Sequence, residues 1–436
     1  MSARTESRIL FTLLAALVGV GAAQAHPFVP GAAQSRPILL QGGDLYTVSH
    51  GVLPATDLLF EGGKIVAIGP GLAAPAGAQV FDVRGKRVYP GLIAAATQLG
   101  LTEIGAVRAT SDYDETGAIS PEAWAGTAFN SDSELIPVAR RHGVTTAQVA
   151  PSGGLLPGRS GIFQLDGWTR EDAAVRAVDG VYLSWPGVSV FNLSLLPPAE
   201  EQRKQIAEAN ALLERAFTEA RAYHLARTAG ETGTTDLRWE AMRPLFRGEI
   251  PLFVEADDPR QIEAAVAFCR KQGVRMVLVG GRESHLVASV LREAKVPVLL
   301  PPTTEVAYRD DDAYDHAYRL PALLHEAGVS FALSYTGGSA WDVRNLPFQA
   351  GIAAGFGLPK EVALRSITLS AAEILGIADR QGSLEVGKSA TLFVSDGDVL
   401  DPLTQRVTRV FIEGRAVDLD NRHEQLYRKY RVKIGE

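Results

Sequence analysis

Short apolar runs alternate with helix-like stretches between residues 91 and 375, and this alternation constrains the fold more than any other feature. The runs 143–151, 251–256, 274–280, 296–301 and 329–335 read as strands, for example VRMVLVG, and stretches such as RQIEAAVAFCRKQG lie between them. Apolar strands that are each followed by a helix predict a parallel sheet covered on both faces. About 280 residues of such units fit an α/β fold with a closed (β/α)8 barrel, and an open doubly wound sheet is the alternative.

Residues 37–89 and 381–416 show a different pattern, in which short β runs are joined by turns containing glycine. DLLFEGGKIVAIGPG reads as a hairpin, and RVTRVFIEGRAVDL joins two β runs through a Glu-Gly turn. The simplest way to bury two such half-sheets is to pack them together. We therefore expect one small composite β-sandwich from 37–89 plus 381–416, a barrel over 90–380 and a tail at 417–436. A long packing helix is expected near 199–225.

Residues 1–25 have the organisation of a secretory signal peptide. Arg4 and Arg8 precede an apolar run from Ile9 to about Val20, and small residues end at Ala25. The run is shorter than the roughly 18 residues that a membrane-spanning helix needs, and an uncleaved anchor is the alternative. We expect cleavage after about Ala25, a periplasmic or secreted chain, and no membrane insertion after cleavage.

Charge and cysteine content exclude some classes of protein. The chain has 43 Lys+Arg against 50 Asp+Glu, a net charge of −7, which argues against nucleic acid as a partner because phosphate binding requires a basic face. Cys269 is the single cysteine, so no intrachain disulfide can form, and its apolar, helix-like surroundings favour core packing over nucleophilic chemistry. The sequence does not specify an oligomeric state.

A family resemblance rests on segments at both ends of the barrel-like region. The segment Tyr89-Pro90-Gly91-Leu92-Ile93, the later ALRSITLSAAEILG (363–376) and GSLEVGKSATLFVSDGD (382–398), with the flanking β segments, together resemble the amidohydrolase superfamily. The nearest branch is imidazolonepropionase-like and dihydroorotase-like. The resemblance covers most of residues 37–416. It implies a (β/α)8 barrel with a composite β-sandwich, and metal-dependent hydrolysis of amide or cyclic amide C–N bonds.

The resemblance also implies a metal site, whose usual ligands are replaced in this chain. The family uses a His-x-His pair on the first strand, a Lys or Glu in mid-barrel, one His on each of two later strands and a final Asp. The sequence assigns no position to the mid-barrel ligand. The other positions fall on Ala96 and Gln98, Glu255, Gly280 or Gly281, and Thr336.

These replacements remove the chemistry of the family's reaction. A divalent metal lowers the pKa of a bound water from about 15.7 to about 7. Alanine, glycine and threonine side chains cannot hold such an ion, which usually needs at least three good protein ligands. We therefore expect no cofactor and a silent or altered catalyst that binds a small-molecule ligand at the barrel mouth. The alternative is an active amidohydrolase that uses Glu255 and non-standard ligands, with a divalent metal such as zinc.

The remaining candidates are side chains near expected strand ends. Glu255 ends an apolar strand, where burial would raise its pKa, and it is the catalytic candidate; a structural role is the alternative. His285 is a second candidate, with a helix-start residue as the alternative reading. The run RDDDAYDH (309–316) has ligand types that would suit a metal, but we expect a solvated loop. The candidates for ligand binding are Gln98, Asp342 and Arg344, together with Arg159 and Ser160, which lie in a Gly-rich stretch (151–168) expected to be a loop.

Overall fold

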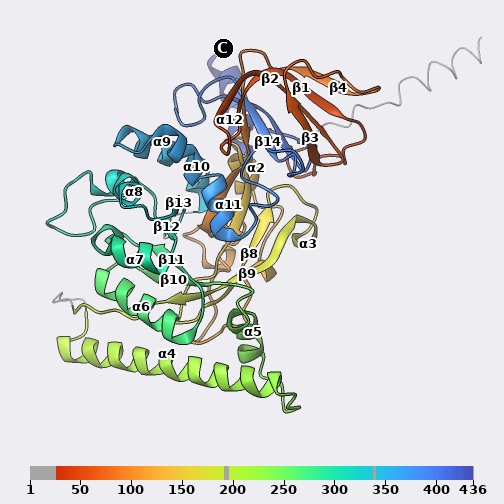
Figure 1. The fold of residues 1–436 in the computed structure, drawn as a ribbon. Helices are drawn as coiled ribbons and strands as arrows, with labels where there is room; N and C mark the ends of the chain where they lie inside the picture. The colour runs from red at the N-terminus through yellow and green to blue at the C-terminus, as the bar shows by residue number, and fades with distance from the viewer. Residues whose placement is uncertain (1–25, 191–195, 337–339, 436) are drawn as a thin grey trace, which may run out of the picture.

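The computed structural model describes residues 26–190, 196–336 and 340–435, and it contains an eight-stranded barrel beside a second sheet (Figure 1). The signal-peptide prediction for 1–25 lies outside these residues. The predicted fold class is confirmed. The barrel strands, in sheet order, are β6 (Leu92–Thr97), β7 (Val144–Val149), β8 (Gly158–Gln164), β9 (Ala174–Ser184), β10 (Leu252–Ala256), β11 (Met276–Gly280), β12 (Val298–Leu300) and β13 (Phe331–Leu333).

The barrel differs from a regular (β/α)8 barrel at β8. This strand pairs antiparallel with both β7 and β9, whereas the other strands of the sheet pair in parallel. The circle closes where Ala95 bridges to Ser334 and the Tyr335 N–H donates to the Ala95 carbonyl oxygen at 3.2 Å. The expectation of an irregular loop over 151–168 was therefore wrong for 158–164, which form a strand buried in the wall.

Most of the helices lie on the outer side of the barrel (Figure 1), whereas α11 packs with the strand residues that face the barrel interior. The bounds are α2 (Leu135–Arg140), α3 (Arg170–Ala173), α4 (Ala199–Thr228), α5 (Leu237–Phe246), α6 (Pro259–Gln272), α7 (Ala288–Ala294), α8 (His316–Glu326), α9 (Leu346–Gly355), α10 (Lys360–Ser366) and α11 (Leu369–Leu375). The predicted long helix is α4, which buries a stripe that includes Leu213 and Phe217. Among the described residues, no helix has both the length and the apolar character needed to cross a bilayer.

The sequence of α6 shows how one of these helices is fixed in place. Asp258 caps its first turn and forms a capping box with Gln261, Pro259 occupies the start, and Gly273 ends the helix in a left-handed conformation. The apolar stripe of α6 includes Phe268, whose ring packs edge-on against Phe217 of α4 at 4.9 Å. Because α6 begins just after β10, this cap also fixes the end of β10.

The two terminal β regions form one sheet. Its strands are β1 (Ile38–Tyr46), β2 (Val52–Glu61), β3 (Lys64–Gly69), β4 (Gln79–Asp82), β5 (Arg87–Pro90), β14 (Leu392–Ser395), β15 (Val407–Ile412) and β16 (Arg415–Val417). The two regions join where β5 pairs antiparallel with β14. Phe60 of β2 packs against Phe411 of β15 with ring centroids 5.1 Å apart, although β14, β5 and β1 separate these strands in the sheet. The sheet therefore curves around a core of its own.

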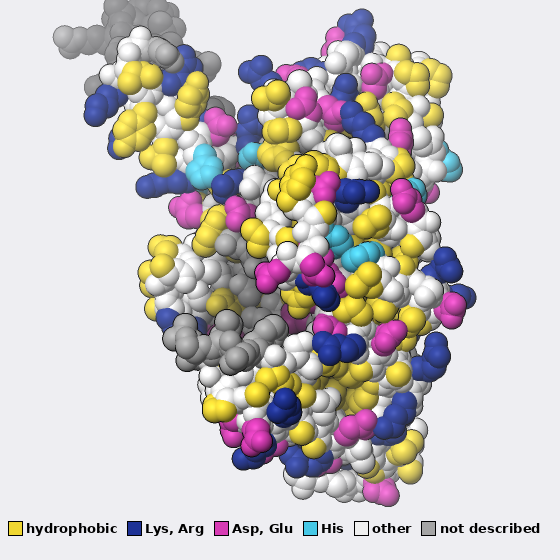
Figure 2. Space-filling view, turned by 90° about the vertical axis from the view of Figure 1, so that its left-hand side faces the viewer, with side chains coloured by type: hydrophobic (Ala, Val, Ile, Leu, Met, Phe, Trp, Pro, Cys, Tyr) yellow, Lys and Arg dark blue, Asp and Glu magenta, His cyan; other side chains and the backbone are white. Residues whose placement is uncertain are grey.

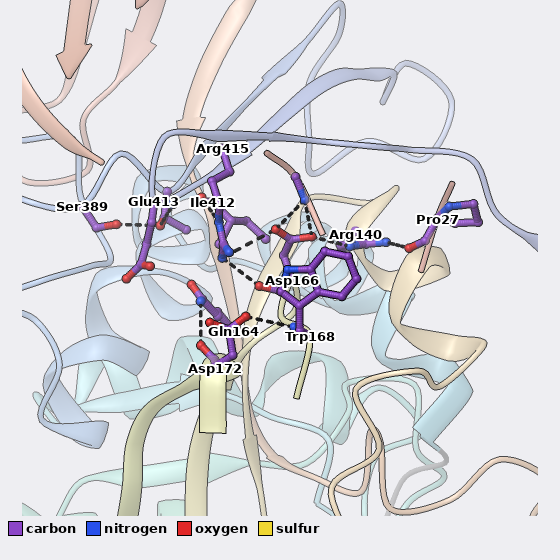
Figure 3. A network of polar contacts seen from close by, with 12 residues as sticks. Pro27, Arg140, Gln164, Asp166, Trp168, Asp172, Ser389, Ile412, Glu413 and Arg415 are labelled. Carbon is purple, nitrogen blue, oxygen red and sulfur yellow. Dashed lines mark hydrogen bonds and ion pairs between the residues drawn. The ribbon is translucent and has the colours of Figure 1, made fainter. Parts of the chain in front are cut away.

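A buried ion pair connects the terminal sheet to the barrel (Figure 3). Asp166, which follows β8, is paired with Arg140 of α2 at 3.0 Å and with Arg415 of β16 at 3.6 Å. Its carboxylate also accepts from the Gly31 N–H at 3.2 Å, and Arg140 donates to the Pro27 carbonyl oxygen. The side chain of Asp166 is 0% exposed. One carboxylate thus ties the N-terminal segment, the barrel and the second sheet together.

The C-terminal tail forms the helix α12 (Arg422–Ile434), which buries none of its residues. Asn421 caps its start by accepting from the N–H groups of His423 and Glu424. Glu424 is ion-paired with Arg141 at 3.4 Å, which holds the helix against the barrel.

Candidate functional site

A cavity of about 380 Å³ opens at the carboxyl ends of the barrel strands. Active sites of barrels of this type lie at the same end, because the loops after the strands converge there. The residues that line the cavity come from β6, β7, β9, β10, β11, β13 and the segments that follow them: Ala96, Thr97, Gln98, Ala150, Pro151, Ser152, Tyr182, Glu255, Ala256, Asp257, Gln261, Val279, Gly280, Arg282, Tyr335 and Thr336.

The first wall is the end of β6, where the resemblance places a His-x-His pair. Ala96 has a φ of 48°, in the left-handed region that non-glycine residues rarely adopt, and the pairing with β7 is irregular between Ala94 and Thr97. The Gln98 amide donates to the Ser152 hydroxyl at 3.2 Å. The methyl group of Ala96 and the hydrogen-bonded amide of Gln98 therefore occupy the two positions of the His-x-His pair. The backbone at Ala96 has an unusual conformation.

A buried polar network lies beneath this wall. The Gln148 side-chain oxygen accepts from the Ala96 N–H at 3.0 Å and from the Tyr182 hydroxyl at 3.2 Å. The Gln148 amide nitrogen donates to Asp179 at 2.6 Å and to Ser160 at 3.4 Å. Burial raises the pKa of Asp179 to about 6, although hydrogen bonds from Ser160 and Gln148 oppose the shift. Through the bond between Gln148 and the Ala96 N–H, the network holds the left-handed conformation at Ala96 in place.

Glu255 of β10 brings a carboxylate into the cavity. One of its oxygens accepts from the Ser184 hydroxyl at 2.7 Å. Burial raises the pKa of Glu255, the hydrogen bond from Ser184 lowers it, and the charge of Asp257 raises it further. A carboxyl group with a raised pKa in a cavity has the properties of a proton acceptor and donor. The structure therefore places the catalytic candidate of the sequence at the cavity wall.

A chain of ion pairs forms the rim beside Glu255. Arg282 is paired with Asp257 at 2.6 Å and binds Glu305 through both its Nε and Nη2 atoms, at 2.7 and 2.8 Å. These two carboxylates raise the pKa of the Arg282 guanidinium against the opposing effect of burial. Asp257 and Glu305 neutralise the charge of Arg282. Among the described lining residues, the Glu255 carboxylate therefore faces the cavity without a cationic partner.

The side chains of the cavity do not fit the metal site that the resemblance implies. Gly280 has a φ of 91°, and a Cβ atom there would lie 2.7 Å from a carboxylate oxygen of Asp257. Thr336 and Gln98 offer only neutral oxygens. Within the described ranges, one group of three His, Cys, Asp or Glu side chains has ligand atoms close enough to share an ion, and none of its members lines this cavity. The expectation that the chain uses no cofactor remains a prediction.

The other predicted site residues lie away from the cavity lining. Ser160 is buried in the wall beside Gln148, and the Arg159 guanidinium donates to the Glu122 carbonyl oxygen at 2.8 Å. Their predicted place in a loop was therefore wrong, because both residues belong to β8, and their ligand-binding role stays a prediction. Asp342 and Arg344 lie in a 3-10 helix, Ala340–Asn345, where they contact Asn345 and Trp341. His285 lies in the 3-10 helix Ser284–Val287.

Part of the site was missed from the sequence. Gln148 of β7 is hydrogen-bonded to Asp179 and Tyr182, which both lie on β9, a strand that was not predicted. Asp257 and Arg282 follow the strands β10 and β11 directly, and polar residues at that place were a signal that could have been used.

A lip at the mouth is formed by the segment after β6 and the connection from β7 to β8. The Ser152 N–H donates to the Tyr113 carbonyl oxygen at 2.8 Å, the Leu156 N–H to the Ala118 carbonyl oxygen at 2.9 Å, and the Ser120 N–H to the Leu156 carbonyl oxygen at 2.8 Å. Main-chain hydrogen bonds thus join the two segments where Ser152 borders the cavity.

Comparison with known proteins supports the resemblance. Residues 240–417 match the model of a family described as the amidohydrolase family. The chain is 23% identical over 393 residues to amidohydrolase tasK of Hapsidospora irregularis, an alignment that covers 83% of this chain but 39% of the relative. It is 48% identical over 56 residues to a dihydroorotase of Geobacter sulfurreducens, 13% of each protein. The chain thus spans well under half the length of these relatives.

Solved structures show the same fold. The crystal structure of an amidohydrolase from Thermotoga maritima MSB8 is similar with a TM-score of 0.78 and 26% identity, over 87% of this chain and 99% of that one. An adenosine deaminase from Xanthomonas campestris with bound zinc is similar with a TM-score of 0.52 and 18% identity, over 92% and 99%. The second likeness concerns the fold alone.

Proposed function

The chain belongs to the amidohydrolase superfamily, and from this premise we propose that its barrel-mouth cavity binds a small molecule bearing an amine or amide N–H group, without the superfamily's metal site. Superfamily membership supports a hydrolase origin for the chain. The observation that carries the proposal is the Glu255 carboxylate, which faces the cavity at the end of β10 where the resemblance places a metal-binding histidine.

Charge determines the kind of ligand. Arg282 is engaged by Asp257 and Glu305, so the lining keeps the negative charge of Glu255. A ligand with an ammonium or N–H group would satisfy this carboxylate, whereas a carboxylate ligand would be repelled by it. The cavity of about 380 Å³ lies within the usual range for small-molecule sites.

Loss of the metal ligands supports an altered reaction. Ala96 and Gln98 stand where the resemblance places histidines, Gly280 offers no side chain at a third histidine position, and Thr336 stands at the position of the final Asp. None of these can activate water as a bound metal does. The proposed site therefore has the partly buried carboxylate of Glu255 where the superfamily has a metal-binding histidine, without the ion that supplies the superfamily's hydroxide.

A matched ligand screen tests the proposal. We suggest ligand-observed NMR with fragments of equal size that carry an amine, a cyclic amide or a carboxylate. Amine and amide fragments are expected to bind, and Glu255→Gln should weaken them by about 10- to 100-fold, the effect of losing one charge-assisted hydrogen bond. Glu263→Gln, an exposed change on α6, is the matched control and should leave binding unchanged. Equal binding of carboxylate fragments would contradict the proposal.

A second candidate function follows from the raised pKa of Glu255. As a general base this carboxylate would take a proton from water, the resulting hydroxide would attack an amide carbonyl, and the proton would pass to the leaving nitrogen as the C–N bond breaks. Mass spectrometry of the cyclic amide fragments after long incubation tests this. Ring-opened product that disappears in Glu255→Gln would favour hydrolysis over simple binding.

Export is the other part of the proposal. The basic residues, apolar run and small residues of 1–25 support a cleaved signal peptide. N-terminal sequencing of protein from the periplasmic fraction of a Gram-negative host is expected to begin near His26. Full-length protein in the cytosolic fraction alone would contradict export.

A further inference from the structure

An acidic and histidine cluster lies outside the cavity, at the same end of the barrel. Glu283, Asp312 and His316 each offer a ligand atom, and these atoms all lie within 4.8 Å of one another. Glu283 lies after β11, and the other two residues come from the connection between β12 and α8 and from the start of α8. Figure 2 shows two adjacent histidine side chains beside acidic ones on this side of the molecule.

Glu283 is the unusual member of the cluster. It is 1% exposed, and its Oε1 atom has no hydrogen-bond partner. The guanidinium of Arg309 lies 3.9 Å from the other oxygen, Oε2, and is itself paired with Asp311 at 3.0 Å. A buried carboxylate oxygen without a partner is rare in folded proteins, because such an atom loses its water and gains nothing in return. A cation would supply the missing partner.

The histidines present the right atoms for a metal. The Nε2 atom of His316 lies 3.2 Å from the Arg282 carbonyl oxygen. Because a carbonyl oxygen only accepts, a neutral His316 ring carries its proton on Nε2 and has a free lone pair on Nδ1. Metal-binding histidines are commonly oriented by this kind of hydrogen bond. The His285 ring centroid is 4.6 Å from that of His316, and its buried Nδ1 atom also has no partner.

We propose that Glu283, Asp312 and His316, with His285 as a fourth donor, bind one divalent transition-metal ion of the zinc type. Two carboxylates and imidazole nitrogens are ligands that zinc accepts, whereas calcium and magnesium prefer oxygen atoms alone. Ligand atoms about 2.1 Å from a tetrahedral ion lie roughly 3.4 Å apart, so binding would draw the side chains together by about 1 Å.

The ion would fix the loop that borders the cavity. The loop after β12 carries Glu305, which holds Arg282 at the cavity rim, as well as Asp312. A metal bound between Glu283 and this loop would join the loop to the end of β11. The inference goes beyond the proposed function and does not depend on it, because no residue of the cluster lines the cavity.

Metal titration of the mature chain tests the proposal. Protein treated with a chelator is titrated with Zn²⁺ against a competing dye, and with Co²⁺, whose visible spectrum reports tetrahedral nitrogen and oxygen ligands. We expect one equivalent of zinc, and at least tenfold weaker binding in Glu283→Gln, Asp312→Asn and His316→Ala. His285→Ala should also weaken binding. Asp310→Asn removes an exposed charge from the same loop and, as the matched control, should bind like the unchanged protein.

Several results would overturn the inference. These are the absence of saturable zinc binding in the unchanged protein, zinc binding of equal strength in Glu283→Gln and His316→Ala, or preference for Ca²⁺ over Zn²⁺. Loss of zinc in Glu255→Gln would place the ion in the cavity and would also contradict it. Circular dichroism of each metal-free variant checks folding, and Asp312, the partly exposed member, provides a variant with little effect on the core.

Discussion

Replacement of Asp166 by asparagine tests whether one buried carboxylate holds the barrel and the second sheet together. The Asp166 and Arg140 side chains are 0% and 3% exposed, and the carboxylate also contacts Arg415 and the Gly31 N–H. Asparagine keeps the shape of the side chain, but it directs an NH2 group at donors and leaves the buried Arg140 without its ion-pair partner. Breaking one side of a buried pair in this way costs about 3–5 kcal/mol.

Urea unfolding measures this cost. With a slope of roughly 3 kcal/mol per molar urea, the value for larger domains, the midpoint for Asp166→Asn should fall by about 1 M or more. Asp82→Asn is the control, because Asp82 and Arg84 form a pair at 2.5 Å whose side chains are 56% and 77% exposed, and solvent screens such pairs so that they contribute little to stability. Equal, small shifts in the two variants would refute the reasoning.

Three further predictions concern buried groups. The pKa of Asp179, raised by burial to about 6 from 3.8, means that the folded state holds a proton that the unfolded state has lost; stability should therefore fall by roughly 3 kcal/mol as pH rises through this window, and Asp179→Asn should abolish the fall in urea titrations at each pH. Equal pH slopes would contradict this. Ala96→Gly should keep or raise the thermal midpoint because φ is 48°, whereas Ala95→Gly should cost about 1 kcal/mol; equal losses would contradict it. Burial raises the pKa of the Cys269 thiol to about 12, so a thiol reagent at about pH 8 should label only unfolded protein, and rapid labelling of folded protein would contradict this.

The sequence predicted those strands whose residues are apolar on both faces. β10 to β13 were found because each is a short apolar run between helices, and β7 was found although VTTAQV contains two threonines and a glutamine. β8 and β9 were missed because GRSGIFQ and AVRAVDGVYLS mix glycine and charged residues with apolar ones. Their polar side chains are accommodated by contacts made elsewhere, such as Arg159 with the Glu122 carbonyl oxygen and Asp179 with Gln148, and no local pattern encodes such contacts.

The site was predictable only where it adjoins an apolar strand. Glu255 was placed at a strand end because the run before it is clear, and the structure puts it in the cavity. The pairing of Arg282 with Asp257 joins residues on separate strand ends, and Glu283 meets Asp312 and His316 only after the chain has folded. The run 309–316 was expected to be a solvated loop, whereas two of its residues, Asp312 and His316, are partly buried beside Glu283.

The reversed direction of β8 has a consequence for how access to the interior can vary. Where a regular barrel would place a helix after β7, this chain turns straight back, and its turn is bonded to the preceding segment through peptide groups such as those of Ser152 and Leu156. These bonds are made by backbone atoms, so most side-chain substitutions in this turn would leave its shape unchanged; Gly153 and Gly154, which have φ of 86° and 69°, are exceptions. Insertion or deletion of residues in this turn would change the shape of the cavity entrance and the size of molecule that can enter. The barrel wall behind the turn would stay intact.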